Sequence, residues 1–495
     1  MKTFFGSVAL ITAFAVLTRG TGFIFRIVLS RVLGAELLGV YQIAFSFFMV
    51  FLTVIASGLP LIISRQISSG KTGPNHNTLV RSGMILSFTA SALIIILVLF
   101  GQPLLKSLFT DQRSYSILVA LVPAILAYSI YTILRAIWWG QKKYFLLGAS
   151  ELAEQIIRVI LFLVFLTFSS FFADLAILAS LSFTIACFLS AALVTILYLK
   201  GSNKSGKQRP AISTVGLLKA ATPITIVRVL TVIAFPIIAV IVPMRLVAAG
   251  WDSTTAVAHF GIAVGMALPL LSIPQAVISS IAVALVPELS KANTAGDYSA
   301  VSKQINSCIK FTLLVNFALL PLFIALGPGI GQFLFANEAA GNYLRQSAWI
   351  MVPMSLSLIT NAILNSLGRE TRAMAHYIIG SAFLFLSIWF LPQFIGIGSL
   401  IVGIGVCMSI AALLNLHTIF RVTGSGLRVI EQLFGFALSA APSGFIAWLV
   451  FRWLDFLPLF FRLGFASAPA FIVLIGIAYS LKLVDINTLK RHNRR

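Results

Sequence analysis

About fourteen apolar stretches, each long enough to cross a bilayer, follow one another through almost the whole chain of 495 residues. A bilayer core about 30 Å thick requires roughly 20 apolar residues for each helical crossing. The stretches are continuously apolar rather than alternating, which favours helices over the strands of a β-barrel. Little sequence remains between them for a water-soluble domain. We therefore expect an all-α polytopic membrane protein with about 14 transmembrane helices.

The net charge of +22 raises the question of nucleic-acid binding, but the positions of the charges indicate a membrane topology. With both termini on the cytoplasmic side, about 24 of the 35 Lys and Arg residues fall on inner loops or tails, and about eight fall on outer loops. This positive-inside bias requires an even number of crossings. Basic loops also attract anionic membrane lipid. We expect a multi-pass protein of the cytoplasmic (inner) membrane with both termini cytoplasmic, and no nucleic-acid partner.

Signals for catalysis or for cofactors are missing from the sequence. Cys187, Cys308 and Cys407 lie inside apolar runs, where we expect small buried residues rather than metal ligands. The five histidines have neither metal-ligand nor catalytic-triad spacing, and no Gly-x4-Gly-Lys-Ser/Thr loop for ATP occurs. We expect no metal, no cofactor and no enzymatic activity. A membrane-embedded glycosyl- or acyltransferase is the weakest alternative, because no paired carboxylates lie at an interface.

The longest polar break in the chain is rich in Gly, Ser, Lys and Pro and separates six apolar stretches from eight. Both halves contain an arginine, a glycine-containing outer loop, an aromatic helix start, and an exit with Pro, Ser and a basic residue. This weak repeat predicts two pseudo-symmetric six-helix lobes around a central cavity, a transporter pattern, followed by two extra C-terminal helices. The expected parts are an N-terminal lobe (1–200), a basic cytoplasmic linker (201–213), a C-terminal lobe (214–420), and the extra helix pair with a basic tail (421–495).

Three arginines within the apolar stretches are candidates for binding substrate. A charge at mid-bilayer costs at least about 2.5–3.5 kcal/mol, so a retained one is a functional candidate. Arg19 and Arg26 are seven residues apart and project from one helix face, where two cations require an anion or a water-filled cavity. Arg26 has the alternative of reaching the outer interface. Arg228 lies about fifteen residues into its stretch with no acidic neighbour in sequence, and it is the strongest single candidate for a substrate contact.

A second charged group shares one face of the fifth apolar stretch. Glu151, Glu154 and Arg158 follow one another at i, i+3 and i+7, and Glu154 to Arg158 is the favourable i to i+4 order for an ion pair. Such a pair can simply neutralise itself inside the bundle. The sequence leaves Glu151 unpaired, so coupling to protons or sodium is an open interpretation for it. Together the charges predict a cationic cavity for a substrate that is anionic at one end, because arginine pairs with phosphate oxygens through a planar fork of donors.

Four sequence motifs are similar to those of a known transporter family. They are TRGTGFIFRIVLSRVLG at 18–34, SGLPLIISR at 57–65, GMALPLLSIP at 265–274 and ALVPELS at 284–290. With them the chain resembles the stage V sporulation protein B family of polysaccharide transporters, within the multidrug/oligosaccharidyl-lipid/polysaccharide (MOP) flippase superfamily. The resemblance covers nearly the whole chain, including the count of crossings. The motifs identify the family better than they identify the cargo.

The resemblance implies an inner-membrane flippase for undecaprenyl-pyrophosphate-linked cell-wall precursors, and the lipid-linked oligosaccharide it favours is lipid II, for peptidoglycan or spore cortex. Our own hypothesis is that a monomer carries this substrate by alternating access. In the related lipid II flippases, arginines of spans 1 and 8 face the cavity. Arg19 matches the first span-1 position, whereas Arg26 falls one residue after the second, where this chain has Phe25. Residues 261–274 of span 8 are uncharged, and Arg228 is our candidate to supply the missing charge.

Two further transport functions fit the same family. One is flipping of another lipid-linked polysaccharide repeat unit, such as a teichuronic-acid or capsule unit. The other is antiport of drugs against cations, since that branch of the superfamily shares the fold. A cationic cavity argues against cationic drugs as cargo, because like charges repel.

Overall fold

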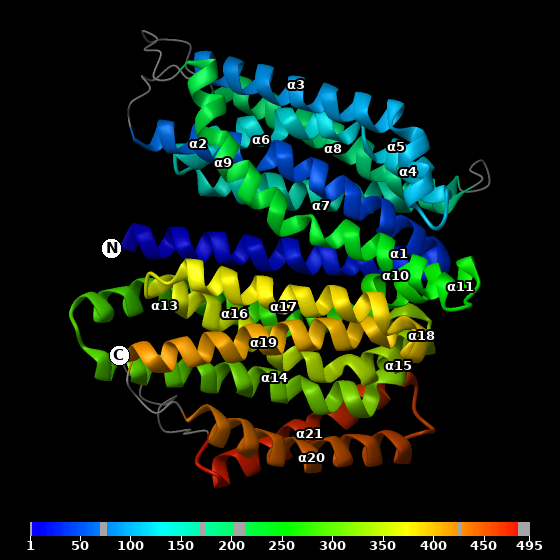
Figure 1. Ribbon diagram of the computed structural model, residues 1–495, viewed down its shortest axis with the longest axis vertical. Coiled ribbons are helices and arrows are strands. Elements are labelled where there is room, and N and C mark those ends of the chain that lie inside the picture. Colours follow the sequence, from blue (N-terminus) through cyan, green and yellow to red (C-terminus); the bar gives the residue numbers. More distant parts are fainter. Residues whose placement is uncertain (1, 70–76, 169–173, 202–212, 424–427, 484–495) are drawn as a thin grey trace. The chain divides into compact units, whose positions relative to one another are not determined.

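The computed structural model describes residues 2–69, 77–168, 174–201, 213–423 and 428–483. These residues are helical almost throughout, and no strand occurs among them (Figure 1). The chain packs as two compact units. The first comprises Met1–Val247 with Trp251–Gly261, and the second comprises Ala248–Gly250 with Ile262–Arg495. The expected all-α class is confirmed.

The first unit is built from eleven of the described helices and the first residue of a π-helical turn. They are α1 (Lys2–Ala56), α2 (Gly58–Ser68), α3 (Asn77–Phe100), α4 (Gln102–Leu108), α5 (Arg113–Leu121), α6 (Ala124–Gly140), α7 (Tyr144–Thr167), α8 (Leu175–Gly201), α9 (Thr214–Val232), α10 (Ala234–Ala248), α11 (Ser253–Phe260) and the π-helical turn η2 (Gly261–Ala267).

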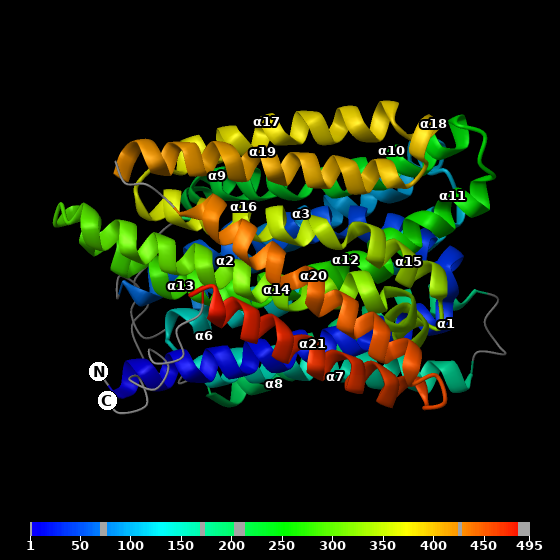
Figure 2. The same ribbon diagram turned by 90° about the horizontal axis from the view of Figure 1, so that it is seen from below.

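The second unit contains the rest of η2 and the remaining helices. These are α12 (Leu268–Leu271), α13 (Ile273–Thr294), α14 (Tyr298–Phe335), α15 (Glu338–Ser347), the 3-10 turn η3 (Ala348–Ile350), α16 (Met351–Ser366), α17 (Glu370–Phe390), α18 (Pro392–Ile395), α19 (Gly398–Thr423), α20 (Val429–Trp453) and α21 (Leu459–Ser480). Helices α17 and α19 lie side by side, as do α20 and α21 (Figures 1 and 2).

The number of membrane crossings follows from helix length and composition. Among the described residues, 12 helical segments are long and apolar enough to cross a bilayer. The first, Leu10–Ser68, has 59 residues and is long enough for two crossings at 1.5 Å per residue. Gly34 interrupts its helical conformation with φ 67°, which glycine adopts without a steric penalty. Helix α7 has 24 residues but three charges. Counting the first segment twice and adding α7 gives the fourteen crossings expected from the sequence.

The helices that follow the basic linker belong to the first unit. Helix α9 packs against α1, α2 and α3. The contact with α2 is close, because a Cβ atom built on Gly58 would lie 2.3 Å from the carbonyl oxygen of Ala221. The first unit therefore extends past the linker at 201–213, most of which lies outside the described residues. The lobe limits expected at 1–200 and 214–420, and the extra segment at 421–495, stay predictions.

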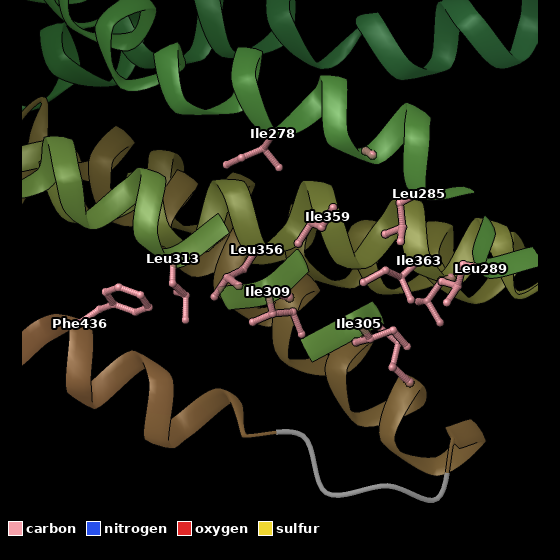
Figure 3. Close-up of a cluster of buried hydrophobic side chains, with 14 of the residues drawn as sticks. Ile278, Leu285, Leu289, Ile305, Ile309, Leu313, Leu356, Ile359, Ile363 and Phe436 are labelled. Atoms are coloured by element: carbon pink, nitrogen blue, oxygen red, sulfur yellow. The ribbon is translucent and has the colours of Figure 1, made fainter. Parts of the chain in front are cut away.

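The core of the second unit lies between α13, α14, α16 and α20. Figure 3 shows Ile278, Ile309, Ile359 and Phe436 among the buried side chains gathered there. Because lipid is as apolar as these side chains, close van der Waals packing rather than exclusion of water holds such helices together. A series of polar contacts between side chains of α16, α17 and α19 adds to this packing. His376 Nδ1 lies 2.8 Å from Asn415 Oδ1, and the Asn415 amide donates to Thr360 Oγ1 at 3.2 Å.

We expect Gly58→Ala to weaken the packing of α2 against α9. The added methyl group would overlap the Ala221 carbonyl and Thr225 Oγ1, both 2.3 Å from its position, and such overpacking costs about 1–3 kcal/mol. Thermal unfolding of the purified protein in detergent measures the loss. Gly476→Ala is the matched control, because nothing lies within 4 Å of its Cβ position. Equal melting temperatures for both variants would contradict this close contact.

Candidate functional site

The two arginines of α1 lie on the helical segment that precedes the Gly34 kink. Since this segment is otherwise regular, their seven-residue separation places them on one face, as expected. The side chain of Arg19 is exposed and that of Arg26 is half-buried. Among the described residues, Arg26 forms no salt bridge. The first helix thus offers a cationic face in the first unit.

Helix α7 packs along α1 and positions this face. Phe14 meets Phe145 with ring centroids 5.6 Å apart and the rings edge to face. Phe25, three turns further along α1, meets Phe162 in the same way, also at 5.6 Å. Edge-to-face rings at this separation attract each other through the positive edge and negative face of their π systems. The two contacts fix the rotation of α1 against α7 on either side of Arg19.

A glutamine of α7 reaches the surface of α1 between the two arginines. Gly22 lies three residues after Arg19 and four before Arg26. The side-chain oxygen of Gln155 is 3.6 Å from the position of a Cβ atom on Gly22. The amide of Gln155 therefore lies over the gap that glycine leaves on the cationic face. Sequence reasoning missed this residue because it is neutral, although an amide within an apolar stretch beside Glu154 was a usable signal.

The ion pair expected on α7 is confirmed. Arg158 donates to Glu154 across one helical turn. Glu154 is 4% exposed, and the Arg158 guanidinium lies 4.2 Å from the centre of the Phe183 ring of α8. The ion pair with Glu154 and the stacking of Arg158 on Phe183 offset the free-energy cost of desolvating both charges. The pair is therefore held inside the unit, where it supports α7 rather than adding net charge.

Glu151 also has a partner, contrary to its unpaired state in the sequence pattern. Arg135 of α6 donates to Glu151 Oε2 at 2.8 Å and to the Leu147 carbonyl at 3.0 Å. The same guanidinium lies 4.8 Å from the centre of the Tyr131 ring. The partner escaped prediction because it comes from the preceding helix, and helical spacing cannot identify a contact between helices. Arg135 nevertheless carried a signal, as an arginine inside an apolar stretch.

The phenol of Tyr41 is buried near both Arg26 and Arg158 of the buried pair. Tyr41 is 3% exposed and lies within electrostatic range of both Arg158 and Arg26. Its ring stacks on Phe45, with centroids 5.5 Å apart, and Phe45 in turn meets Phe183. The part of α1 after the kink therefore packs against α8 through Phe45. Of the two guanidinium groups near Tyr41, that of Arg158 is paired with Glu154, whereas that of Arg26 has no carboxylate partner among the described residues.

Arg228 lies in the same unit on α9, with an exposed side chain. No described residue forms a salt bridge with it. Ala221 and Thr225, which contact α2 at Gly58, precede Arg228 by seven and three residues and so share its face. Helix α9 also contacts α1. Arg228 and the α1 arginines thus belong to neighbouring helices of one unit, and their convergence on one substrate stays a prediction.

The cysteines and the other ligand-type residues form no cluster in the described part of the chain. Cys187 and Cys407 are buried and Cys308 is half-buried, and all three are free thiols. Within the described ranges, no three His, Cys, Asp or Glu side chains are placed to hold a metal ion.

An all-helical bundle with some fourteen possible crossings and charges within its helices is typical of multi-pass membrane transporters. The family described as "Polysaccharide biosynthesis protein" matches residues 5–293. The chain belongs to this family, within the MOP flippase superfamily, and is related to the lipid II flippases.

Individual relatives have low sequence identity, but their matches cover most of the chain. Stage V sporulation protein B of Bacillus subtilis (strain 168) is 23% identical over 475 residues, covering 92% of this chain and 90% of the relative. The lipid II flippase MurJ of the same organism is 20% identical over 409 residues, covering 74% of each protein. The family resemblance noted from the motifs is confirmed.

Solved structures support the same fold. A lipid II flippase MurJ in an inward closed conformation matches with a TM-score of 0.67 and 17% identity, covering 95% of this chain and 99% of the other. A multidrug resistance MATE family transporter in an inward-facing conformation matches with a TM-score of 0.64 and 15% identity, covering 82% and 94%. The fold is thus common to transporters with different cargoes.

We expect Glu154→Gln to destabilise the protein by about 3–5 kcal/mol, because it leaves the guanidinium of Arg158 buried without its counter-charge. Thermal unfolding in detergent measures the loss. The double variant Glu154→Gln with Arg158→Met removes both charges and should recover most of it. A single variant as stable as the unmodified protein would show that the pair is dispensable.

Proposed function

We propose that this protein is a flippase that moves an undecaprenyl-pyrophosphate-linked cell-wall precursor from the inner to the outer leaflet, with lipid II as the favoured cargo. The cationic face of α1 carries the proposal. Arg19 and Arg26 lie about one turn before and one turn after Gly22, over which the amide of Gln155 lies. The two carboxylates of α7 are occupied by Arg158 and Arg135. A diphosphate fits this arrangement because its oxygens accept several charge-assisted hydrogen bonds at once. Membership of a family with lipid II flippases among its relatives supports it.

The proposed mechanism is alternating access. The guanidinium groups of Arg19, Arg26 and Arg228 bind the diphosphate from the cytoplasmic side, and the prenyl tail stays in lipid, where it is soluble. The sugar headgroup then becomes exposed to the outside. With the inside negative, about two negative charges moving outward gain roughly 4–5 kcal/mol per 100 mV. The emptied cationic site is drawn back by the same field, so voltage assists both half-cycles.

The two internal ion pairs have a positioning role in this mechanism. Arg158 and Glu154 lock α7 to α8 through the Phe183 ring. Arg135 and Glu151 tie α6 to α7. Since α7 carries Gln155 and sets the rotation of α1 through Phe25, these pairs hold the substrate-binding side chains in place. The pairing of Glu151 with Arg135 supports a structural role over coupling to protons or sodium.

We expect Arg19→Ala and Arg228→Ala each to lower flipping by about 10-fold or more, because each removes a charge-assisted hydrogen bond worth about 1.5–3 kcal/mol. The assay follows labelled lipid II across vesicle membranes that contain the purified protein. Arg19→Lys keeps the charge but loses the planar fork, so it should be intermediate.

Arg372→Ala is the matched control for these variants, since Arg372 is an exposed arginine near the start of α17. Flipping that is unchanged in Arg19→Ala and Arg228→Ala would refute the cationic site. Competition by unlabelled lipid-linked glycans in the same vesicles identifies the cargo. A repeat unit of another polysaccharide that competes better than lipid II would replace lipid II as the substrate while keeping the diphosphate chemistry.

Gln155 provides an independent test of the site. We expect Gln155→Glu to lower flipping more than Gln155→Ala does, because a carboxylate between Arg19 and Arg26 competes with the diphosphate for both guanidinium groups. Gln155→Ala loses one hydrogen bond to a charged group, which corresponds to about a tenfold effect. The readout is the same flipping assay, with melting temperature measured in parallel to confirm that both variants fold. If the order of the two variants were reversed, the amide would not lie in the substrate site.

A further inference from the structure

A groove of about 580 Å³ lies in the second unit between α14 and α20, with Arg345 of α15 at its edge. Its lining is otherwise apolar and comes from the middle and the C-terminal half of both long helices. The groove is therefore separate from the cationic face of α1, which belongs to the first unit.

Small residues on α20 create this groove. Ala437, Ala440, Ala441 and Gly444 line it and share one face of α20, at i, i+3, i+4 and i+7. A Cβ atom on Gly444 would lie 3.3 Å from Cβ of Pro321, so the helices approach each other there. On this face of α20 the side chains are small from Ala437 to Gly444, and the large side chains of Phe445 and Trp448 line the groove further along. The groove stays open along one side, where an apolar molecule can enter it.

The length of the groove corresponds to one leaflet of a bilayer. From Ala437 to Trp448, both of which line the groove, α20 rises about 16 Å at 1.5 Å per residue. Half of a hydrocarbon core about 30 Å thick is about 15 Å. A single acyl chain matches this depth, whereas an undecaprenyl chain is much longer than one leaflet. The large side chains at the end near Trp448 are partly exposed, at 42% for Trp448 and 61% for Phe445.

Two arginines stand at this same end of the groove. Arg345 is exposed and lies level with Gly327 of α14, whose Cβ position is 3.0 Å from Cβ of Arg345. The guanidinium of Arg452 lies 5.5 Å from the centre of the Trp448 ring. Neither arginine forms a salt bridge with any described residue. Asp455, three residues after Arg452, is bound by Arg462. An apolar channel thus ends at two cations without carboxylate partners in the described chain.

We propose that this groove binds an anionic phospholipid, with one acyl chain along α14 and α20 and its phosphate between Arg345 and Arg452. The length of the groove matches that of one acyl chain, and the two arginines match the negative charge of the phosphate. A zwitterionic lipid brings its own cation to the same place and gains less from the arginines. In the orientation that the proposed function requires, the end with the arginines faces outward and the lipid belongs to the outer leaflet. The binding itself does not depend on that orientation.

Fluorescence quenching by brominated lipids tests the site directly. The purified protein is reconstituted into phosphatidylcholine vesicles that contain brominated phosphatidylglycerol or brominated phosphatidylcholine. The quenching of Trp448 is the difference between the unmodified protein and Trp448→Phe. We expect phosphatidylglycerol to be preferred at Trp448, with each arginine contributing about a fivefold preference. Arg345→Gln should lose its share of the preference, whereas Arg372→Gln, the exposed control on α17, should retain it.

A second variant tests occupancy without changing charge. Gly444→Leu should lower the quenching of Trp448 by both lipids, because the larger side chain fills the groove. Equal quenching by the two lipids in the unmodified protein would overturn the proposal, as would displacement of phosphatidylglycerol by undecaprenyl phosphate at lower concentration. None of these measurements requires transport, so a flippase inactive towards lipid II could still show the lipid site, and an active one could lack it.

Discussion

The free-energy cost of placing a charge within the bilayer determines how the charged side chains of the first unit are paired. A lone guanidinium at mid-membrane costs at least about 2.5–3.5 kcal/mol, and this chain places several arginines along its apolar helices. Two of them meet carboxylates on α7, and each also lies over an aromatic ring. Helix α7 has a net charge of −1 of its own, from Glu151, Glu154 and Arg158, and Arg135 of α6 neutralises it. Arg26 is different, because it has no carboxylate partner among the described residues, and the α7 side chain that lies over Gly22, one turn before it, is the amide of Gln155.

Hydropathy predicted the architecture well because lipid leaves the backbone few choices. A chain that cannot bond to water must satisfy its own amides, so long apolar stretches become helices. The Glu154–Arg158 pair was predictable for a similar reason, since one turn of helix fixes its geometry. Contacts between different helices were not predictable from the sequence. The partner of Glu151 on α6, the approach of Gln155 to Gly22, and the packing of α9 on α2 depend on helix rotation, which periodicity does not determine.

The same fold serves proteins whose names specify different cargoes, lipid II in one and multiple drugs in another. Fold alone therefore does not identify what is carried. The distinction lies in a few side chains on a shared scaffold. In this chain they are cations and an amide on α1, α7 and α9, a set suited to oxyanions. The groove of the second unit has a similar combination of charge and apolar surface, because Arg345 and Arg452 lie at one end of its apolar lining.

The pairing of Arg135 with Glu151 has a consequence for biogenesis. Helix α7 carries three charges, each unfavourable for a segment that leaves the translocon alone, at about 2.5–3.5 kcal/mol near the centre of the membrane. Only residues 141–143 separate it from α6. A hairpin of the two helices presents Glu151 already neutralised and Glu154 matched by Arg158. Helix α7 is thus expected to enter the lipid together with α6, because Arg135 of α6 neutralises Glu151.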